Sequence, residues 1–359
     1  MSVIIFRYLS KEIMRATLIA TLILLVIFVT NQSVQFLERT AAGQLPATAL
    51  LQAIALQIPL FSGYLLPLGL YLGAILTLSR MYIDSEMTIL YACGVSRFKI
   101  LGMVFLVAMF VAVIVTWLMM VVVPKAQGAT NVLFNRAAVT ASVQQVIPGR
   151  FMSFGNDQEN SIVLYAGGIG KHHVLSDVFL AKKVMDKWGM IVAKSARERK
   201  MHDSPVEYLV FDQGDRYVGE PGEKNFQLLQ FQEYGARVLL ENVPDVNAVQ
   251  YYSIPTLWRL QKTNLSAAAE LQWRMAMPIS VLIFALLAVP LSETKPRHGK
   301  FIQILPAMII YLCYGDLLFL TRSWIQAGRI SATLGMWWVH AAMLIVVLML
   351  IWYRWGRQR

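Results

Sequence analysis

The sequence predicts a helical membrane protein with six transmembrane helices, three before and three after an inserted all-β domain. Three observations lead to this fold class. Of the 359 residues, 57% are hydrophobic and only 15% are charged, whereas a soluble domain carries about a quarter charged residues. Long apolar runs occupy both ends of the chain. A polar stretch with short β-branched and aromatic segments separates them.

Six runs are long and apolar enough to cross a bilayer, whose hydrocarbon core requires roughly 20 residues of helix. The first run lacks the short core and the small-residue cleavage site of a signal peptide, so we expect it to be retained as a helix. The predicted spans cover residues 16–36, 53–78, 100–123, 275–292, 301–320 and 333–353.

Positive charge predicts the orientation of these helices. The N-terminus, the loop after span two, the loop after span four and the C-terminal tail carry three Lys or Arg each. The short loops on the other side carry only Arg39, Arg322 and Arg329. Because cytoplasmic loops are enriched in basic residues, both termini are predicted to be cytoplasmic and residues 124–274 periplasmic, in an inner membrane. The net charge of +11 therefore belongs to membrane flanks, and no nucleic-acid partner is expected.

The chain accordingly divides into residues 1–123 with spans one to three, a periplasmic domain over 124–270, and residues 271–359 with spans four to six. Strands are predicted at Ser161–Ala166, Val174–Val184, Gly189–Lys194, Glu207–Phe211 and Phe226–Phe231. Turns are predicted at Gly167-Gly168, Asp186-Lys187, Asp212-Gln213-Gly214-Asp215 and Pro221-Gly222. This spacing suggests a small sandwich or roll. Such a domain serves either as a passive lid or as an open sheet edge for a partner strand.

Motifs for catalysis and for ATP binding are absent from the sequence. Gly170-Lys171 and Gly299-Lys300 are not followed by Ser or Thr and lack the preceding glycine of a P-loop. Neither H-E-x-x-H nor G-x-S-x-G occurs. The pair His172-His173 has no further ligand at metal spacing, so neither a metal nor another cofactor is predicted. The chain is predicted not to be an enzyme, and any ATP-driven step requires a separate subunit.

A short amphipathic helix is predicted at about residues 84–94, between spans two and three. Asp84-Ser85 offers an N-cap, Glu86 suits the first turn, and Gly94 suits the residue after the helix. Three apolar residues share one face at helical spacing. The helix either packs on lipid headgroups or docks in a groove of a cytoplasmic ATPase. The candidate coupling site comprises Asp84, Ser85, Glu86, Met87, Leu90 and Tyr91.

Asp316 lies inside the fifth predicted span, where an ionisable residue is a functional candidate. An intramembrane aspartyl protease would need Gly-x-Gly-Asp, but the sequence here is Cys313-Tyr314-Gly315-Asp316, and no second intramembrane Asp occurs. The protease hypothesis therefore fails, and we expect a paired or hydrated Asp316 near the outer half of the span.

Dispersed motifs along nearly the whole chain resemble one known family. They are Arg7-Tyr8-Leu9 with Glu12, Ser85-Glu86, Ala92-Cys93-Gly94-Val95-Ser96, Ala269-Glu270-Leu271-Gln272-Trp273-Arg274, Val289-Pro290-Leu291-Ser292, Pro296-Arg297 with Gly299, and Leu305-Pro306-Ala307. This set is similar to the LptF/LptG family of lipopolysaccharide export permeases, and more so to its F-type members.

The resemblance implies a fold, an activity and a set of partners. It implies that the chain pairs with a second, LptG-like permease and that two copies of a cytoplasmic LptB-like ATPase bind this pair. It also implies that the complex extracts lipopolysaccharide from the outer leaflet of the inner membrane. The outward domain would be a β-jellyroll that joins a bridge formed by a single-span LptC-like protein and a periplasmic LptA-like carrier. Glu86 matches the family's acid that contacts the ATPase.

The resemblance also implies that spans one, two and five line a lipid cavity and its lateral gates. Where family members often place basic residues near the outer end of span one, this chain has Asn31, Gln32 and Gln35. The candidate cavity residues are Gln32, Gln35, Phe36, Tyr64, Pro67, Met308, Tyr311, Asp316, Phe319 and Arg322.

Two other functions agree with the same topology. A non-transporting scaffold could use its outer domain to bind envelope proteins, although this leaves the capped amphipathic helix unexplained. A permease for another envelope lipid, such as a lipoprotein or a phospholipid, differs only in the identity of the bound lipid.

Overall fold

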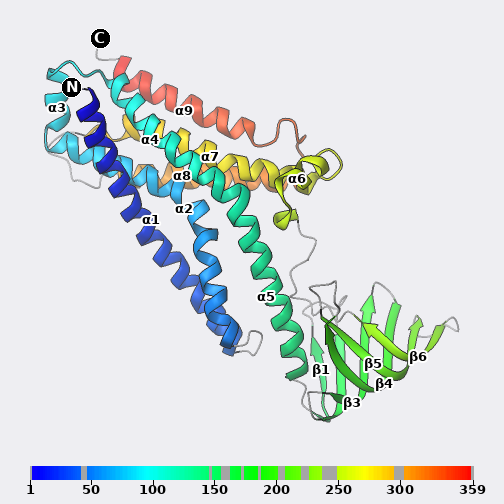
Figure 1. Ribbon diagram of the computed structural model, residues 1–359. Helices are drawn as coiled ribbons and strands as arrows, with labels where there is room; N and C mark the ends of the chain where they lie inside the picture. Colours follow the sequence, from blue (N-terminus) through cyan, green and yellow to red (C-terminus); the bar gives the residue numbers. More distant parts are fainter. Residues whose placement is uncertain are drawn as a thin grey trace. The chain divides into compact units, whose positions relative to one another are not determined.

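The structure is a computed structural model. It describes residues 2–41, 47–144, 148–154, 162–170, 174–184, 187–200, 207–219, 226–236, 249–294 and 303–356. The helices are α1 (Ser2–Ala41), α2 (Ala47–Ile83), α3 (Glu86–Ala92), α4 (Arg97–Trp117), a π-helical turn η1 (Leu118–Val122), α5 (Val123–Gln144), a 3-10 turn η3 (Val249–Tyr251), α6 (Ile254–Leu260), α7 (Leu265–Leu291), α8 (Ile304–Gln326) and α9 (Trp337–Trp355) (Figure 1). The strands are β1 (Phe151–Phe154), β2 (Ile162–Ile169), β3 (Leu175–Val184), β4 (Lys187–Lys200), β5 (Glu207–Gly219) and β6 (Phe226–Ala236).

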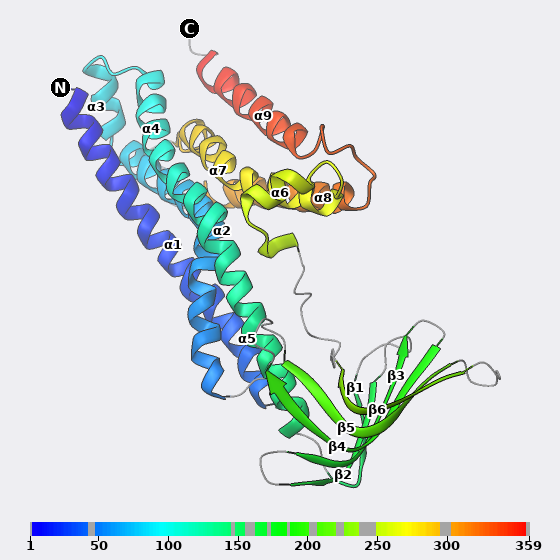
Figure 2. The same cartoon turned by 45° about the vertical axis from the view of Figure 1, so that its right-hand side comes forward.

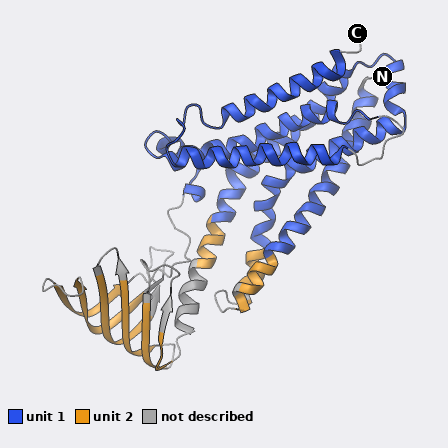
Figure 3. Ribbon diagram, turned by 180° about the vertical axis from the view of Figure 1, so that it is seen from behind, with its two compact units in different colours: residues 1–32, 55–127, 247–359 blue, residues 33–54, 128–246 orange. Residues whose placement is uncertain are grey.

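The chain forms two compact units (Figure 3). The first contains residues 1–32, 55–127 and 247–359, and the second contains residues 33–54 and 128–246. The first unit is a helical bundle, while the second holds the sheet together with helical segments. The predicted division at residue 124 falls inside a continuous helix, because the third span runs on through η1 and α5.

Within the described residues, six helices are long and apolar enough to cross a membrane, which confirms the predicted number. They are Val3–Glu38, Ala49–Ile83, Arg97–Phe134, Leu265–Leu291, Ile304–Gln326 and Trp337–Trp355. Most of these helices extend beyond the predicted spans because helical backbone continues through their polar flanks, whereas the last two begin three or four residues later than predicted. In α1, for example, the basic N-terminal residues are already helical.

Helix α7 is the centre of the bundle. Within its most apolar stretch 72% of the residues are buried, compared with 17% for α1. It packs against α4, α8 and α9. Phe284 of α7 stacks on Tyr71 of α2 with ring centres 4.8 Å apart and meets Tyr314 of α8 edge-to-face at 5.2 Å. Tyr314 also shares a buried 2.7 Å hydrogen bond with Nδ1 of His340 in α9. Aromatic packing and a polar contact thus join four helices.

Helices α1 and α2 approach closely where two glycines meet two threonines. A Cβ atom on Gly73 would lie 2.6 Å from the backbone nitrogen of Thr17, and one on Gly69 would collide with Oγ1 of Thr21. Small residues four positions apart let membrane helices come together at the backbone. The two helices therefore form one packed pair.

The third span contains the π-helical turn η1, in which one residue is inserted into the helical repeat. Met119 of this turn is fully buried. A Cβ atom on Gly63 of α2 would lie 2.9 Å from its sulfur. The π turn thus places the Met119 side chain against Gly63 of α2, where a larger residue would require the methionine to shift.

The sheet is antiparallel, and each described strand pairs with its neighbour in sequence, in the order β1-β2-β3-β4-β5-β6. All five predicted strands occur, mostly longer than expected. Strand β1 was missed, since four residues show too little alternation. The core of this sheet contains Leu164, Ala166, Leu175, Val178, Leu180, Ile191, Ala193, Ala196, Leu209 and Phe211. The described strands form an open antiparallel sheet. The β-jellyroll stays a prediction.

Two of the predicted turns lie inside strands. Gly167-Gly168 is part of β2, and Asp212–Asp215 is part of β5, so both predictions are wrong. Asp177 and Gln213 have left-handed backbone angles, with φ of 51° and 49°. Glycine and residues with positive φ occur at bends inside strands as well as in turns, and the sequence signal does not distinguish the two.

These positions form one line across the sheet. The paired residues on either side leave Gly167, Asp177, Lys194 and Gln213 facing one another on consecutive strands. Ala193 and Ala196 lie three residues apart, yet both are buried, although a regular strand would point them to opposite faces. The break in alternation at this line keeps the apolar side chains on one face and leaves the register between neighbouring strands unchanged. The strands of the sheet are curved, as Figure 2 shows.

Gly73→Leu is expected to force α1 and α2 apart and to lower stability by about 1–3 kcal/mol, a typical cost of overpacking. The thermal unfolding midpoint of the detergent-purified protein would measure this. Gly102→Leu in α4 is the matched control, because a Cβ atom there meets nothing within 4 Å. Equal midpoints for the two variants would contradict the close α1–α2 contact.

Candidate functional site

The short helix between spans two and three exists and covers Glu86–Ala92. Gly94 follows it with φ of 83°, and the amides of Gly94 and Val95 donate to the carbonyls of Tyr91 and Leu90. This pair of bonds is the Schellman arrangement that ends helices at glycine. The predicted cap at the start differs, because Ser85 has φ of 62° and its side chain makes no capping hydrogen bond.

The apolar face of α3 holds the helix on its own bundle. Met87 is buried in the main core, and Leu90 and Tyr91 are partly buried against it. The sequence predicts these three side chains to be part of the ATPase-coupling site. Met87 is buried in this chain, whereas Leu90 and Tyr91 keep part of their surface accessible, and the coupling role of the three stays a prediction. The open face carries Thr88 and Ile89, and Ile89 is 62% exposed.

The acid at the start of α3 is anchored to α1. The Tyr8 hydroxyl donates to Glu86 at 3.1 Å, while the neighbouring Asp84 is exposed. One turn further along α1, Glu12 accepts from Arg80 at the end of α2 at 3.1 Å. The first two spans and α3 are thus joined by polar contacts at one end of the bundle.

Glu293, just beyond α7, is the centre of a larger network at the same end. Its carboxylate accepts from the Trp355 indole at 2.7 Å and from the Tyr82 hydroxyl at 3.4 Å. Arg97 of α4 lies 3.6 Å from it. Its backbone carbonyl accepts from Arg354 at 2.6 Å. One residue therefore connects α2, α4 and α9 next to α3.

Tyr91 extends this network into α3. Its hydroxyl shares a 2.7 Å hydrogen bond with that of Tyr82, and the Arg97 guanidinium lies 5.7 Å from the centre of its ring. Burial raises the pKa of the Tyr91 phenol above its ordinary value, so the hydroxyl keeps its proton at neutral pH. Sequence reasoning missed the network, although Glu293 directly follows the Val289–Ser292 motif.

The candidate cavity residues do not form one site. Asp316 and Phe319 are exposed on α8, and Phe319 is 65% exposed. Within the described residues no hydrogen bond or ion pair of Asp316 occurs. Pro67 is buried in the bundle, and Phe36 is buried against Phe134 in the second unit. Both side chains are therefore buried within this chain, and their role at a lipid cavity stays a prediction.

The remaining cavity candidates are intermediate in burial or exposed. Met308 and Tyr311 are partly buried against the main core, and Gln32 is half-buried while Gln35 is exposed. Tyr64 lies beside Trp273 of α7, with ring centres 6.4 Å apart.

Arg322, expected in the cavity, is instead paired with α7. It donates to Glu270 at 2.6 Å and lies over the Trp273 ring at 5.0 Å. Glu270 also accepts from Arg274 at 2.8 Å. Glu270 and Arg274 both belong to the Ala269–Arg274 family motif. Glu270 and Arg274 lie four residues apart in a membrane helix, and this spacing is the sequence signal that indicates the cluster.

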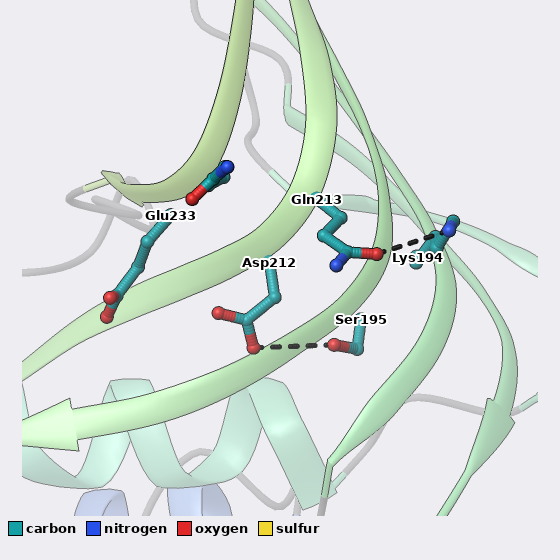
Figure 4. A pocket seen from close by; sticks show the side chains of 6 residues that line it. Lys194, Ser195, Asp212, Gln213 and Glu233 are labelled. Carbon is teal, nitrogen blue, oxygen red and sulfur yellow. Dashed lines mark hydrogen bonds between the residues drawn. The ribbon is translucent and has the colours of Figure 1, made fainter.

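A polar depression of about 630 Å³ lies on the sheet, at the line where the strands bend (Figure 4). Asp212 accepts from Ser195 at 3.4 Å, and Lys194 donates to Gln213 at 3.1 Å. Among the described residues no group of three metal-ligating side chains occurs. His172-His173 lies outside the described residues.

The family model "Lipopolysaccharide export system permease LptF/LptG" matches residues 7–353. The chain belongs to the LptF/LptG family. The match spans all six helices and the inserted sheet, so it concerns the whole architecture rather than one part. The family comprises transport subunits, and this member is accordingly not itself an enzyme.

Curated relatives agree with this membership. The lipopolysaccharide export system permease proteins LptF of Escherichia coli K12 and of Shigella flexneri are each 30% identical to this family member over 355 residues. The aligned region covers 97% of this chain and 94% of each relative.

Glu293→Ala in this LptF/LptG family member is expected to lower stability by about 1–3 kcal/mol, because the Trp355 indole loses its acceptor and Arg97 loses its ion-pair partner. Glu293→Gln should lose less, since an amide oxygen still accepts from Trp355. Thermal unfolding in detergent measures both variants. Glu38→Ala, which removes an exposed carboxylate near the end of α1, is the control. An effect of Glu293→Ala no larger than that of the control would refute the network.

Proposed function

We propose that this permease extracts lipopolysaccharide from the outer leaflet of the inner membrane and passes it toward a periplasmic bridge, driven by a cytoplasmic ATPase. Membership of the LptF/LptG family makes it a permease subunit of the lipopolysaccharide export system. The observation that carries this function is the family match over residues 7–353. The geometry of α3 and α8 suggests how the chain performs it.

The ATPase side of the proposal rests on α3. Its buried face attaches it to the bundle, while Asp84, Glu86, Thr88 and Ile89 lie at or near its open side. We assign this open side to a groove of an LptB-like ATPase, two copies of which would serve this chain and an LptG-like permease. Because Tyr91 and Glu293 connect α3 to three spans, a displacement of α3 would move those spans.

The lipid side of the proposal rests on α8. Its exposed face includes Leu312, Asp316, Phe319 and Leu320. An apolar wall suits acyl chains, each buried CH₂ of which contributes about 0.8 kcal/mol to membrane binding. Extraction of the lipid therefore needs both an apolar cavity and an energy source. A carboxylate on this wall would face the hydrated headgroup or a partner subunit.

The sheet would receive the lipid on the periplasmic side, with both termini of the chain in the cytoplasm. Strand β6 pairs only with β5 among the described strands, and Phe226, Leu228 and Leu229 are exposed along it. An unpaired edge with apolar side chains suits strand addition. We assign this edge to an LptC-like bridge protein that continues to an LptA-like carrier, with the sheet as one β-jellyroll of the series.

Glu86→Ala is expected to weaken ATPase docking while the chain stays folded, because the helix loses the acid on its open side. Co-purification of the ATPase and lipopolysaccharide release from proteoliposomes measure the effect. Tyr8→Phe is the matched control, since it removes the hydrogen bond to Glu86 and keeps the carboxylate. Normal lipopolysaccharide release by Glu86→Ala, or an equal loss of ATPase binding in Tyr8→Phe, would contradict the coupling role of Glu86.

Native mass spectrometry of the complex, purified from its own membranes, tests the function as a whole. One second permease, two ATPase copies and bound lipopolysaccharide are expected. The same proteins with another lipid would keep the transporter and change its substrate. A chain without an ATPase, bound only to envelope proteins, would favour the scaffold.

A further inference from the structure

A charged cluster lies where the chain returns from the sheet to the bundle. Glu270 and Arg274 share one face of α7, and their side chains are 5% and 1% exposed. One carboxylate oxygen of Glu270 accepts from Arg274 at 2.8 Å, and the other accepts from Arg322 of α8 at 2.6 Å. A single acid thus holds two bases from two helices.

Arg274 also holds the returning segment. Its two terminal nitrogens donate to the carbonyls of Gln250 and Tyr252, each at 2.8 Å. One guanidinium therefore serves a carboxylate and two backbone carbonyls at once. Only arginine presents donors in a rigid planar fork of this kind, and lysine does not replace it. The segment that leads from the sheet into α6 and α7 is fixed to α7 at this point.

The charges of the cluster do not balance. Two arginines and one glutamate leave one positive charge, whereas Glu270 with Arg274 alone is neutral. Arg322 is the more exposed base, with 23% of its side chain accessible, and it rests on the Trp273 ring. Because a neutral pair remains when it leaves, Arg322 is the member of the cluster whose departure leaves the least uncompensated charge. The buried pair, in contrast, is costly to separate.

A second contact at the same end of α7 holds the loop between α8 and α9. Gln272 donates to the carbonyl of Ala332 at 2.6 Å and accepts from the amide of Met336 at 2.9 Å. The loop between α8 and α9 is thereby held independently of Arg322. Release of Arg322 would free the end of α8 without detaching that loop.

We propose that Glu270, Arg274 and Arg322 form a joint that transmits movement of α8 to the segment returning from the sheet. With Arg322 docked, α8, α7 and residues 250–252 move as one body. With Arg322 released, α8 moves alone. The proposal rests on the proposed function, in which α8 is a wall of the lipid cavity. The three residues position the moving parts and need not touch the lipid.

Spin labelling tests the joint. Thr256→Cys, exposed on α6, carries the label in a chain with Cys93→Ser and Cys313→Ser, studied in the native complex. Label mobility is compared between the nucleotide-free and the vanadate-trapped states. We expect a nucleotide-dependent change in the parent, its loss in Arg322→Met, and its partial return in Arg322→Lys. Arg274→Lys should leave the label mobile in both states, because the returning segment is no longer held.

Arg329→Met is the matched control, since it removes an exposed positive charge just beyond α8 and leaves Glu270 untouched. An unaltered response in Arg322→Met, or a response lost equally in Arg329→Met, would overturn the joint. So would a complex that releases lipopolysaccharide while the parent label never changes, and the proposed function would then stand. A complex that hydrolyses ATP but releases no lipopolysaccharide would overturn the proposed function and the joint with it.

Discussion

Close packing around α7 holds this bundle together, because helices in a lipid bilayer gain no hydrophobic stabilisation from contact with one another. What remains is the fit of side chains and a few polar contacts. Phe284 meets rings from α2 and α8, and Gly69 and Gly73 bring α1 onto α2. Each of these contacts depends on a particular residue size, so the bundle has little freedom to repack.

Helix α7 also connects the two charged networks. Glu270 lies near its beginning, and Glu293 follows its end. A helix of 27 residues is about 40 Å long at 1.5 Å per residue, enough to cross a bilayer. In the proposed mechanism, force that enters through α3 and Glu293 reaches the joint at Glu270 along one buried helix.

The sheet shows where pattern reading succeeds and where it fails. Alternation of apolar residues located five of the described strands, since a half-buried strand must alternate. Gly167-Gly168 and Gln213-Gly214 resemble turns in the sequence but lie inside strands, because glycine permits both a turn and a bend within a strand. The sign that was overlooked is the spacing of three between Ala193 and Ala196. Only the pairing of neighbouring strands reveals that such irregularities form one line.

The sequence by itself determined the six spans, the inserted strands, the helix ending at Gly94 and the family motifs, because these depend on local composition and spacing. It did not determine which face of α3 is open, or that Arg322 binds Glu270. Those two residues lie 52 positions apart, and no local pattern records such a contact. Only the tertiary structure brings them together, because helix packing decides which charges must neutralise one another in a medium that does not solvate them.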